Sequence, residues 1–189
     1  ETPLWFAPKG EEAHDIVSFR RSNDFAHVKA ECLAVRNSVG ITEIANFAKY
    51  EIRGTGAEGW LAHLMTNITP REGRMVLTSM LNEAGKIIGD FAIAKAGDEH
   101  FYMWGSSQAE IYHMRWFEKH LPDDGSVTIA PFGMALVGLS IAGPNARAVL
   151  QKLTHEDVSN DAFKFMAHRN LDLGAVPAMV NRISYTGDL

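Results

Sequence analysis

The sequence predicts an α+β fold built of two lobes of antiparallel sheet with flanking helices, and three observations support this class. Short segments in which apolar residues alternate with polar ones follow one another through the middle of the chain, separated by turn residues, as in an antiparallel meander. Segments with apolar residues three and four positions apart lie on either side of these strands and are typical of amphipathic helices. A second succession of strand, turn, helix and strand begins near Ala135, which favours two lobes over one continuous sheet.

The chain of 189 residues is long enough for one compact domain or two small lobes. We expect a lead-in segment at residues 1–22, a first lobe at residues 23–133 and the start of a second lobe at residues 134–189. The chain stops within a strand-and-turn pattern, RISYTGDL, that nothing closes. We therefore expect an incomplete second lobe and a fold truncated at its C-terminus.

The elements of the first lobe follow from side-chain spacing. Residues 24–39 carry apolar side chains three and four apart and are followed by Gly40, which predicts an amphipathic helix. Residues 49–54 alternate apolar and charged side chains and predict a half-exposed strand, after which residues 57–65 predict a short helix. The three strands of the meander are expected at residues 74–81, 86–95 and 100–105.

The next helix is expected at residues 108–121, ending before Pro122. The side chains that it should bury are Ile111, Met114, Phe117 and Leu121. The second lobe is expected to contain a strand at 135–143, a helix at 143–153 with Pro144 near its first turn, and a strand at 176–187.

Composition excludes several classes of protein. Hydrophobic residues make up 46% of the chain and charged residues 22%, which are ordinary globular values. The formal net charge of -5 argues against general attraction to nucleic acid or to an anionic membrane, and we expect neither as a partner. A single cysteine excludes an intramolecular disulfide. Without a signal peptide or a long apolar run, a cytoplasmic protein is expected, or one of the mitochondrial matrix if the source is eukaryotic; the oligomeric state stays open.

Two common ligand-binding motifs, for dinucleotides and for zinc, are not supported by the surrounding sequence. Residues 54–59, GTGAEG, match the dinucleotide pattern G-x-G-x-x-G, but the preceding strand carries charged side chains and the following strands form a meander, so we expect a tight turn into a helix. The eight histidines lack the spacing of a zinc motif, and we expect no metal site. Trp60, Trp104 and Trp116 could stack a planar ligand, although aromatic residues at such spacing usually belong to the core.

Asp90 is the residue that the pattern leaves unexplained. It lies within KIIGDFAIAK, where alternation gives it apolar neighbours on either face, and a buried carboxylate without partners is costly. One interpretation is structural: Gly89 marks a bulge, and Asp90 accepts hydrogen bonds from nearby backbone N–H groups. The other is functional: Asp90 faces a pocket between the lobes, where it orients a nitrogen or takes a proton. Spacing does not decide between them.

Longer motifs carry a resemblance that runs almost from end to end. The segments GRMVLTSMLNEAGKIIGDFAIAK, FYMWGSSQAEIYHMRWFEKHLP, SIAGPNARAVLQKLTHEDVSNDAF and RISYTGDL resemble the tetrahydrofolate-binding aminomethyltransferase family, which includes the glycine-cleavage T-protein. ETPLWFAPKG and the HLP and VSNDAF segments are most similar to the carboxy-terminal folate half of dimethylglycine and sarcosine dehydrogenases.

The resemblance implies a set of site residues. Asp90 corresponds to the catalytic carboxylate of the family, and Tyr185 to a tyrosine that lines the folate pocket; Asn67 and Ser106 are expected near the site. Leu77 stands where T-proteins often carry a pocket tyrosine.

Two further departures concern the family motifs themselves. Gly89 replaces the first aspartate of an Asp-Asp pair, and Asp188 replaces a glutamate, while the last acidic residue of that motif would lie beyond Leu189.

The function implied is a tetrahydrofolate-dependent transfer of a one-carbon unit, aminomethyl or iminium, from a methylamine-type donor. By this resemblance the domain belongs to a dimethylglycine or sarcosine dehydrogenase-like protein, with FAD held in a module upstream of these residues. A stand-alone T-protein or another methyl transferase is an alternative within the enzyme class. A non-catalytic folate-binding module is the alternative from a different class.

Overall fold

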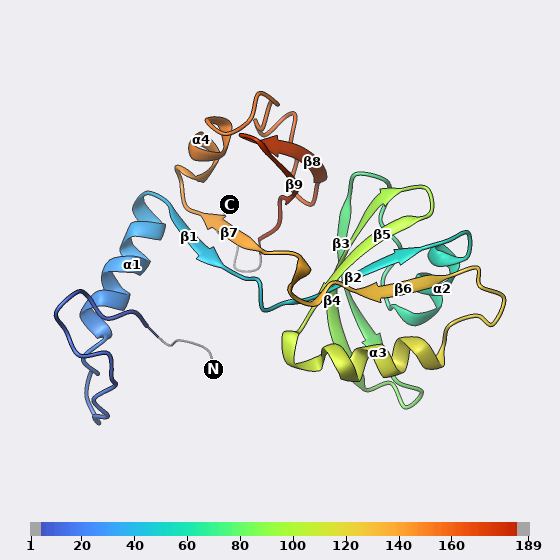
Figure 1. Ribbon diagram of the computed structural model, residues 1–189, viewed down its shortest axis with the longest axis horizontal. Helices are drawn as coiled ribbons and strands as arrows, with labels where there is room; N and C mark the ends of the chain where they lie inside the picture. Colours follow the sequence, from blue (N-terminus) through green and yellow to red (C-terminus); the bar gives the residue numbers. More distant parts are fainter. Residues whose placement is uncertain (1–4, 185–189) are drawn as a thin grey trace.

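The computed structural model describes residues 5–184, and its main feature is a five-stranded antiparallel sheet with the strand order β3-β4-β5-β2-β6 (Figure 1). Every neighbouring pair in this sheet is antiparallel, and consecutive strands β3, β4 and β5 form the expected meander. The strands are β2 (Ala48–Arg53), β3 (Met75–Leu81), β4 (Ile87–Gly97), β5 (His100–Gly105) and β6 (Thr128–Pro131).

Two helices pack on one face of this sheet and enclose the main core. They are α2 (Ala57–Leu64) and α3 (Glu110–Lys119), the latter preceded by the short 3-10 helix η1 (Ser107–Ala109). The inward residues alternate with outward ones along each strand, as half-covered antiparallel strands require. The side chains at the centre of this core are Tyr50, Ile52, Leu61, Phe91, Ile93, Phe101, Met103 and Phe117.

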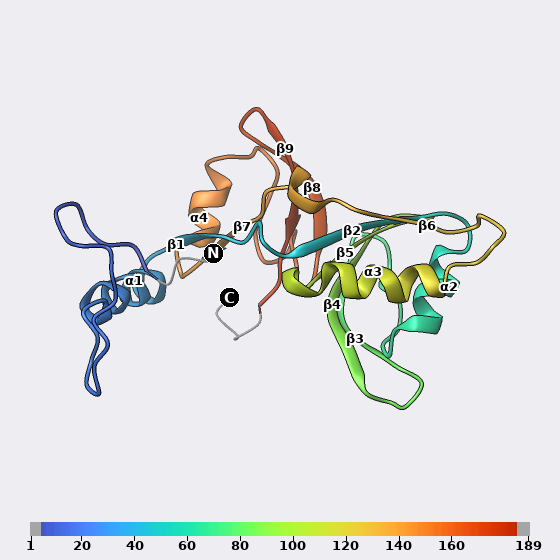
Figure 2. The same ribbon diagram turned by 60° about the horizontal axis from the view of Figure 1, so that its bottom comes forward.

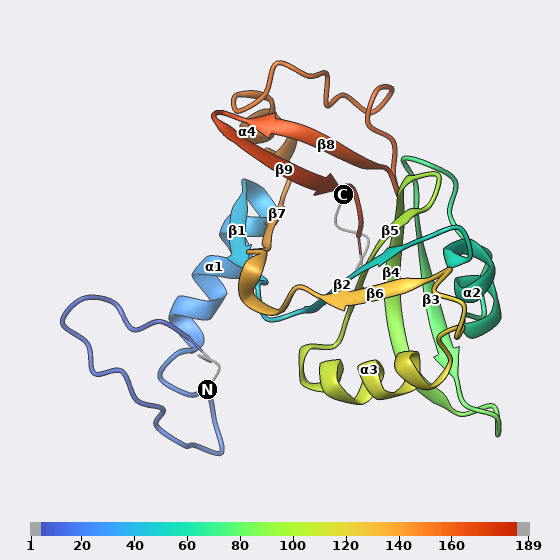
Figure 3. The same cartoon turned by 45° about the vertical axis from the view of Figure 1, so that its right-hand side comes forward.

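The remaining elements form two short ladders beside the sheet. Strand β1 (Gly40–Glu43) pairs with β7 (Leu139–Ala142), and β8 (His168–Leu173) pairs with β9 (Val176–Asn181). Figures 2 and 3 show the β8–β9 hairpin on the side of the five-stranded sheet that lies away from α3. A smaller core holds this region together, built from Val158, Phe163, Ala167 and Leu171.

The other helices are α1 (Phe25–Asn37), α4 (Ala146–Gln151) and the 3-10 helix η2 (Gly133–Ala135). Helix α1 extends away from the sheet (Figure 1), and it buries no residue among the described parts of the chain. The apolar spacing of residues 24–39 therefore predicts the helix correctly. The apolar side of this helix is not buried against another element of the described chain.

The elements agree with the predicted class, and the differences have physical reasons. Strands β1, β6 and β8 were not expected, because each is short or rich in polar residues and takes its strand form from pairing with a distant segment. The domain boundaries at residues 22 and 133 stay predictions. The pairing of β1 with β7 joins segments from the two predicted lobes in one ladder.

Two expectations about burial are wrong. Ile111 is 70% exposed, and His113 takes its place in the core, because α3 turns the His113 and Phe117 side towards the sheet. The strand at residues 48–53 is not half exposed: it lies between β5 and β6, and Lys49 is 4% exposed. Periodicity shows which residues share a face of a strand or helix. Whether that face is buried depends on which distant segments of the chain pack against it.

No helix within the described residues is long and apolar enough to cross a membrane. Among the same residues, no three histidine, cysteine, aspartate or glutamate side chains are grouped as ligands for a metal ion.

Candidate functional site

The face of the five-stranded sheet opposite the helices carries the residues that sequence analysis singled out. In the antiparallel ladders Ser79 lies opposite Asp90, and Leu77 lies opposite Ala92, which in turn lies opposite Trp104. Because directly opposed residues project from the same face, these five side chains share one surface. This surface, from here on called the open face, is where a ligand can meet Asp90.

Asp90 is exposed, which corrects the expectation of a buried carboxylate in a pocket between the lobes. The apolar neighbours that suggested burial, Phe91 and Ile93, project to the helix side of the sheet instead. Asp90 accepts a hydrogen bond from the hydroxyl of Ser79, and none of the ion pairs formed by residues 5–184 includes it. Its carboxylate is therefore accessible and keeps capacity to accept further hydrogen bonds.

The structural interpretation of Asp90 is correct about the bulge but not about the hydrogen-bond partner of the carboxylate. A β-bulge does interrupt the β3–β4 ladder: Met80 pairs with Gly89, whereas Leu81 pairs with Ile87. However, the partner recorded for the Asp90 side chain is a side-chain hydroxyl, not the backbone N–H groups that this interpretation requires. The bulge is therefore present beside Asp90, but it does not supply the hydrogen-bond donors of the carboxylate.

Asn67 lies beside Leu77 at the edge of the open face. Its side-chain amide donates to the carbonyl oxygen of Leu77 at 3.0 Å, and its backbone N–H donates to the hydroxyl of Thr78 at 3.1 Å. These contacts attach the segment after α2 to strand β3. The side chain of Leu77 is 46% exposed, so it presents apolar surface next to Asn67.

Ser106 follows the end of β5 and is exposed. Gly105 next to it packs beside β4: a Cβ atom there would lie 2.7 Å from the ring of Phe91 and in ordinary contact, at 3.7 Å, with the backbone oxygen of Asp90. The structure thus brings Asn67, Leu77, Asp90 and the Ser106 segment to one end of the sheet. Tyr185 lies outside the described residues.

Ser79, Ala92 and Trp104 are the three of the five side chains defining the open face that sequence reasoning did not assign to the site. Trp60 donates its indole N–H to His120 and packs against Phe117 in the core. Trp104 differs, because it is half-buried and its row on the open face continues through Ala92 to Leu77. Alternation within β5 was the signal that could have distinguished it, because it separates Trp104 from the apolar pair Phe101 and Met103.

The segment that leads into β8 covers the far end of this face. The backbone N–H of Met75 donates to the carbonyl of Met166, and the ring of His168 lies beside those of Tyr102 and Trp104. His168 is 3% exposed, its Nδ1 lies 2.7 Å from Oδ1 of Asn181, and burial lowers its pKa. Solvent exposure of the open face therefore increases from the covered end at Met75 to the exposed end at Asp90.

Lys49 continues the row beyond Trp104, to which it is directly opposed. Its ammonium group donates to the backbone carbonyls of Ala45 at 2.5 Å and Phe47 at 2.7 Å. Lys49 thus attaches the loop before β2 to the sheet and closes the side of the open face away from Leu77.

In the GTGAEG turn, backbone N–H groups that could bind a ligand already donate to carbonyl groups of the protein. The N–H of Gly54 donates to Glu99, and that of Gly56 donates to Ser126. Gly54 has a φ of 123°, and a Cβ atom there would lie 2.1 Å from the carbonyl oxygen of Ser126. These glycines allow the turn to pack against the segment before β6, which supports the expected tight turn into α2.

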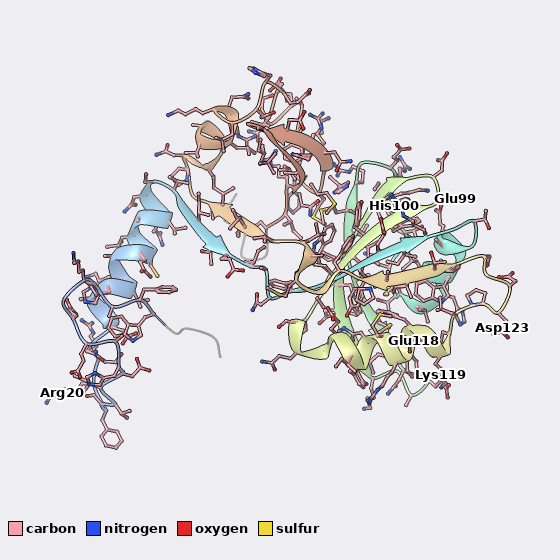
Figure 4. All side chains as sticks on the ribbon, in the orientation of Figure 1. Arg20, Glu99, His100, Glu118, Lys119 and Asp123 are labelled. Atoms are coloured by element: carbon pink, nitrogen blue, oxygen red, sulfur yellow. The ribbon has the colours of Figure 1, made fainter. Side chains whose placement is uncertain are left out.

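Polar groups elsewhere in this lobe lie away from Asp90. His100 at the start of β5 and Arg53 at the end of β2 both bond to the carboxylate of Glu51 on β2. Figure 4 shows His100 and Glu99 apart from Glu118 and Lys119 of α3. Two surface concavities also lie elsewhere, one beside α4 and one along α1.

Comparison with known proteins identifies the family. The model of the GCVT N-terminal domain matches residues 1–189, so the chain belongs to this family of aminomethyltransferase-type domains. The solved structure of glycine cleavage system aminomethyltransferase T from Bartonella henselae aligns with a TM-score of 0.70 at 20% identity, covering 84% of this chain and 42% of that one. This agreement confirms the predicted mixed fold of antiparallel sheets with flanking helices.

Two curated relatives show the range of the family. The chain is 35% identical over 190 residues to human mitochondrial dimethylglycine dehydrogenase, covering 100% of this chain and 22% of the relative. It is 29% identical over 181 residues to an aminomethyltransferase of Chloroherpeton thalassium, covering 95% of this chain and 49% of the relative. The chain therefore spans between a fifth and a half of the length of these relatives.

Proposed function

We propose that this domain binds tetrahydrofolate on the open face and takes part in transferring a one-carbon unit to it from a methylamine-type donor. The observation that carries the proposal is the accessible carboxylate of Asp90 at one end of a partly apolar surface, within a family of aminomethyltransferase-type domains. Ser79 and Asn67 supply further polar groups around the same end.

The residues present fit such a ligand. Tetrahydrofolate has a flat ring with amide-like edges, which needs apolar surface together with a few convergent polar groups. Leu77, Ala92 and Trp104 form a continuous row of apolar side chains across three strands, and Asp90 lies next to that row. When bound, tetrahydrofolate supplies the nitrogen that accepts the one-carbon unit.

The chemical role of Asp90 follows from its charge and its neighbours. A carboxylate stabilises a cationic iminium or aminomethyl donor by electrostatic attraction. An oxygen of Asp90 also accepts the proton that the attacking nitrogen loses as its bond to carbon forms. The hydroxyl of Ser79 occupies one oxygen, Oδ1, and thereby orients the carboxylate towards the ligand.

The parent protein is proposed to be of the dimethylglycine or sarcosine dehydrogenase type. A flavin that generates the iminium would then bind outside these residues, since the Gly54 and Gly56 amides are already bonded to the protein's own carbonyls. The position of Tyr185 in the folate pocket is part of the same proposal.

The test is Asp90→Asn in the complete protein, assayed for methylene transfer to tetrahydrofolate with dimethylglycine and sarcosine as donors. We expect a loss of about tenfold to ten-thousandfold in transfer rate, the range for removing a positioned acid-base group. Asp98→Asn is the matched control, because Asp98 is an exposed carboxylate in the turn that follows β4.

Normal transfer by Asp90→Asn would contradict the role of Asp90. Calorimetric binding of tetrahydrofolate without any transfer by the unaltered protein would instead support the non-catalytic folate-binding module.

A further inference from the structure

Strand β4 contains a β-bulge two residues before Asp90. Met80 pairs with Gly89, but the next residue of β3, Leu81, pairs with Ile87, so Ile88 has no Cα partner on β3. A bulge bends its strand and redirects the side chains beside it. The groups that hold this bulge therefore affect where the carboxylate of Asp90 points.

The side chain of His113, from α3, contacts the bulge from the helix side of the sheet. Its Nε2 lies 3.1 Å from the carbonyl oxygen of Ile88, and its Nδ1 lies 3.3 Å from the hydroxyl of Tyr50. Because a carbonyl can only accept, Nε2 carries the proton and Nδ1 accepts from the Tyr50 hydroxyl. The His113 ring is 1% exposed, and burial lowers its pKa, which favours this neutral form.

Gly89 makes this approach possible. A Cβ atom at Gly89 would lie 2.8 Å from Nε2 of His113 and 2.6 Å from the ring of Phe91. Phe91 packs edge-on against His113, with ring centroids 4.7 Å apart. The glycine, the bulge and the buried imidazole thus form one packed arrangement immediately before Asp90.

We propose that His113 is a positioning residue for Asp90 that acts through the carbonyl of Ile88. The inference rests on the proposed function of Asp90. His113 lies on the helix side of the sheet, so it does not meet a ligand on the open face, and its influence passes through the backbone of β4. Loss of its hydrogen bond lets the bulge relax and moves the carboxylate, which slows transfer more than it weakens folate binding.

The test is a double-mutant cycle between His113 and Asp90 in the complete protein. His113→Leu removes both hydrogen bonds, whereas His113→Gln keeps an N–H donor for Ile88. We expect His113→Leu to lower kcat by about tenfold with the KM for tetrahydrofolate changed less than about twofold, and His113→Gln to recover most of that loss. In the Asp90→Asn background the same leucine substitution should change kcat by less than about twofold, because its effect requires the carboxylate.

Two further variants keep the proposal falsifiable if His113→Leu does not fold. Tyr50→Phe removes only the hydroxyl that bonds Nδ1, and Gly89→Ala displaces the imidazole without altering it; both should slow transfer in the Asp90 background and not in Asp90→Asn. Gly59→Ala is the matched glycine control, since a Cβ atom there meets nothing within 4 Å.

Equal losses of kcat in both backgrounds would overturn the proposal and assign His113 to the core alone. Full transfer by Asp90→Asn would be a different failure, because it removes the proposed function of Asp90 and leaves folate binding to be measured separately.

Discussion

The hydroxyl of Ser79 on β3 donates a hydrogen bond to the carboxylate of Asp90 on β4, across a directly opposed pair of the antiparallel ladder. Ser79 is half-buried and Asp90 is exposed, so the pair lies at the boundary between the sheet and solvent. The hydrogen bond limits the rotamers of Asp90 while leaving its other oxygen, Oδ2, available to a ligand.

Removing the Ser79 hydroxyl should therefore reduce transfer less than removing the carboxylate. We expect Ser79→Ala to lower kcat by about threefold to tenfold, because the carboxylate stays in place but loses the hydrogen bond that orients it. The free energy of unfolding should change by less than about 0.5 kcal/mol, as is usual for surface positions. Steady-state kinetics and urea unfolding measure the two effects. Thr128→Ala, an exposed strand hydroxyl on β6, is the control, and a Ser79→Ala rate as low as that of Asp90→Asn would contradict this ranking.

Trp104 should contribute to folate affinity rather than to chemistry. Its ring lies in the row that leads from Leu77 through Ala92, and aromatic stacking adds about 0.5–1.5 kcal/mol beyond buried area. We expect Trp104→Leu to weaken tetrahydrofolate binding by about threefold to tenfold, measured by calorimetry, with kcat at saturating folate nearly normal. Trp5→Leu is the control, because Trp5 stacks on His27 near the N-terminus. Unchanged affinity in Trp104→Leu would remove this residue from the folate surface.

Stability should decrease as the pH falls from about 7 towards 5. Burial lowers the pKa of both His113 and His168, so the folded protein resists protonation at these rings, whereas the unfolded chain binds protons near the ordinary histidine pKa of about 6.5. The unfolded state then carries more protons in this window, which lowers the free energy of unfolding. Glu51 and Glu58 have lowered pKa values, so they act below about pH 4.5, outside the window.

The measurement is the urea midpoint as a function of pH. His113→Gln and His168→Gln should each flatten the slope between pH 7 and pH 5 relative to the unaltered protein. His155→Gln should leave the slope unchanged, because His155 is exposed. A slope that neither buried-histidine variant alters would show that other groups control acid stability.

Lys49 should matter for stability through the loop that it holds. Its buried ammonium group donates to the carbonyls of Ala45 and Phe47, and Lys49→Met leaves both without this donor. We expect the free energy of unfolding to fall by about 1–3 kcal/mol, the usual cost of unsatisfied buried polar groups. Chemical denaturation compares this variant with Lys86→Met, an exposed lysine before β4. Unchanged or increased stability would mean that removing the buried charge outweighs the lost hydrogen bonds.

Local patterns in the sequence determined much of the fold. Alternation in RMVLTSML, KIIGDFAIAK and HFYMWG predicted three strands of a meander, and the structure pairs them in order as β3, β4 and β5. Spacing of three and four residues predicted helices that the structure places at α1, α2 and α3. These predictions succeed because they depend on backbone periodicity, which is a property of neighbouring residues. The ordered motifs likewise identified the family, which the match over residues 1–189 confirms.

Tertiary structure alone decided which surfaces are covered. Alternation places Asp90 on one face of β4, but α2 and α3 cover the other face, so the carboxylate is exposed although its neighbours in sequence are apolar. Lys49 is buried against the loop before β2, where the carbonyls of Ala45 and Phe47 accept from its ammonium group, although the charges of its strand suggested exposure. His113 is buried because α3 turns it towards the sheet, where the carbonyl of Ile88 and the hydroxyl of Tyr50 satisfy its ring nitrogens. Burial depends on segments far apart in the chain meeting in space, and a periodic pattern carries no information about which segments will meet.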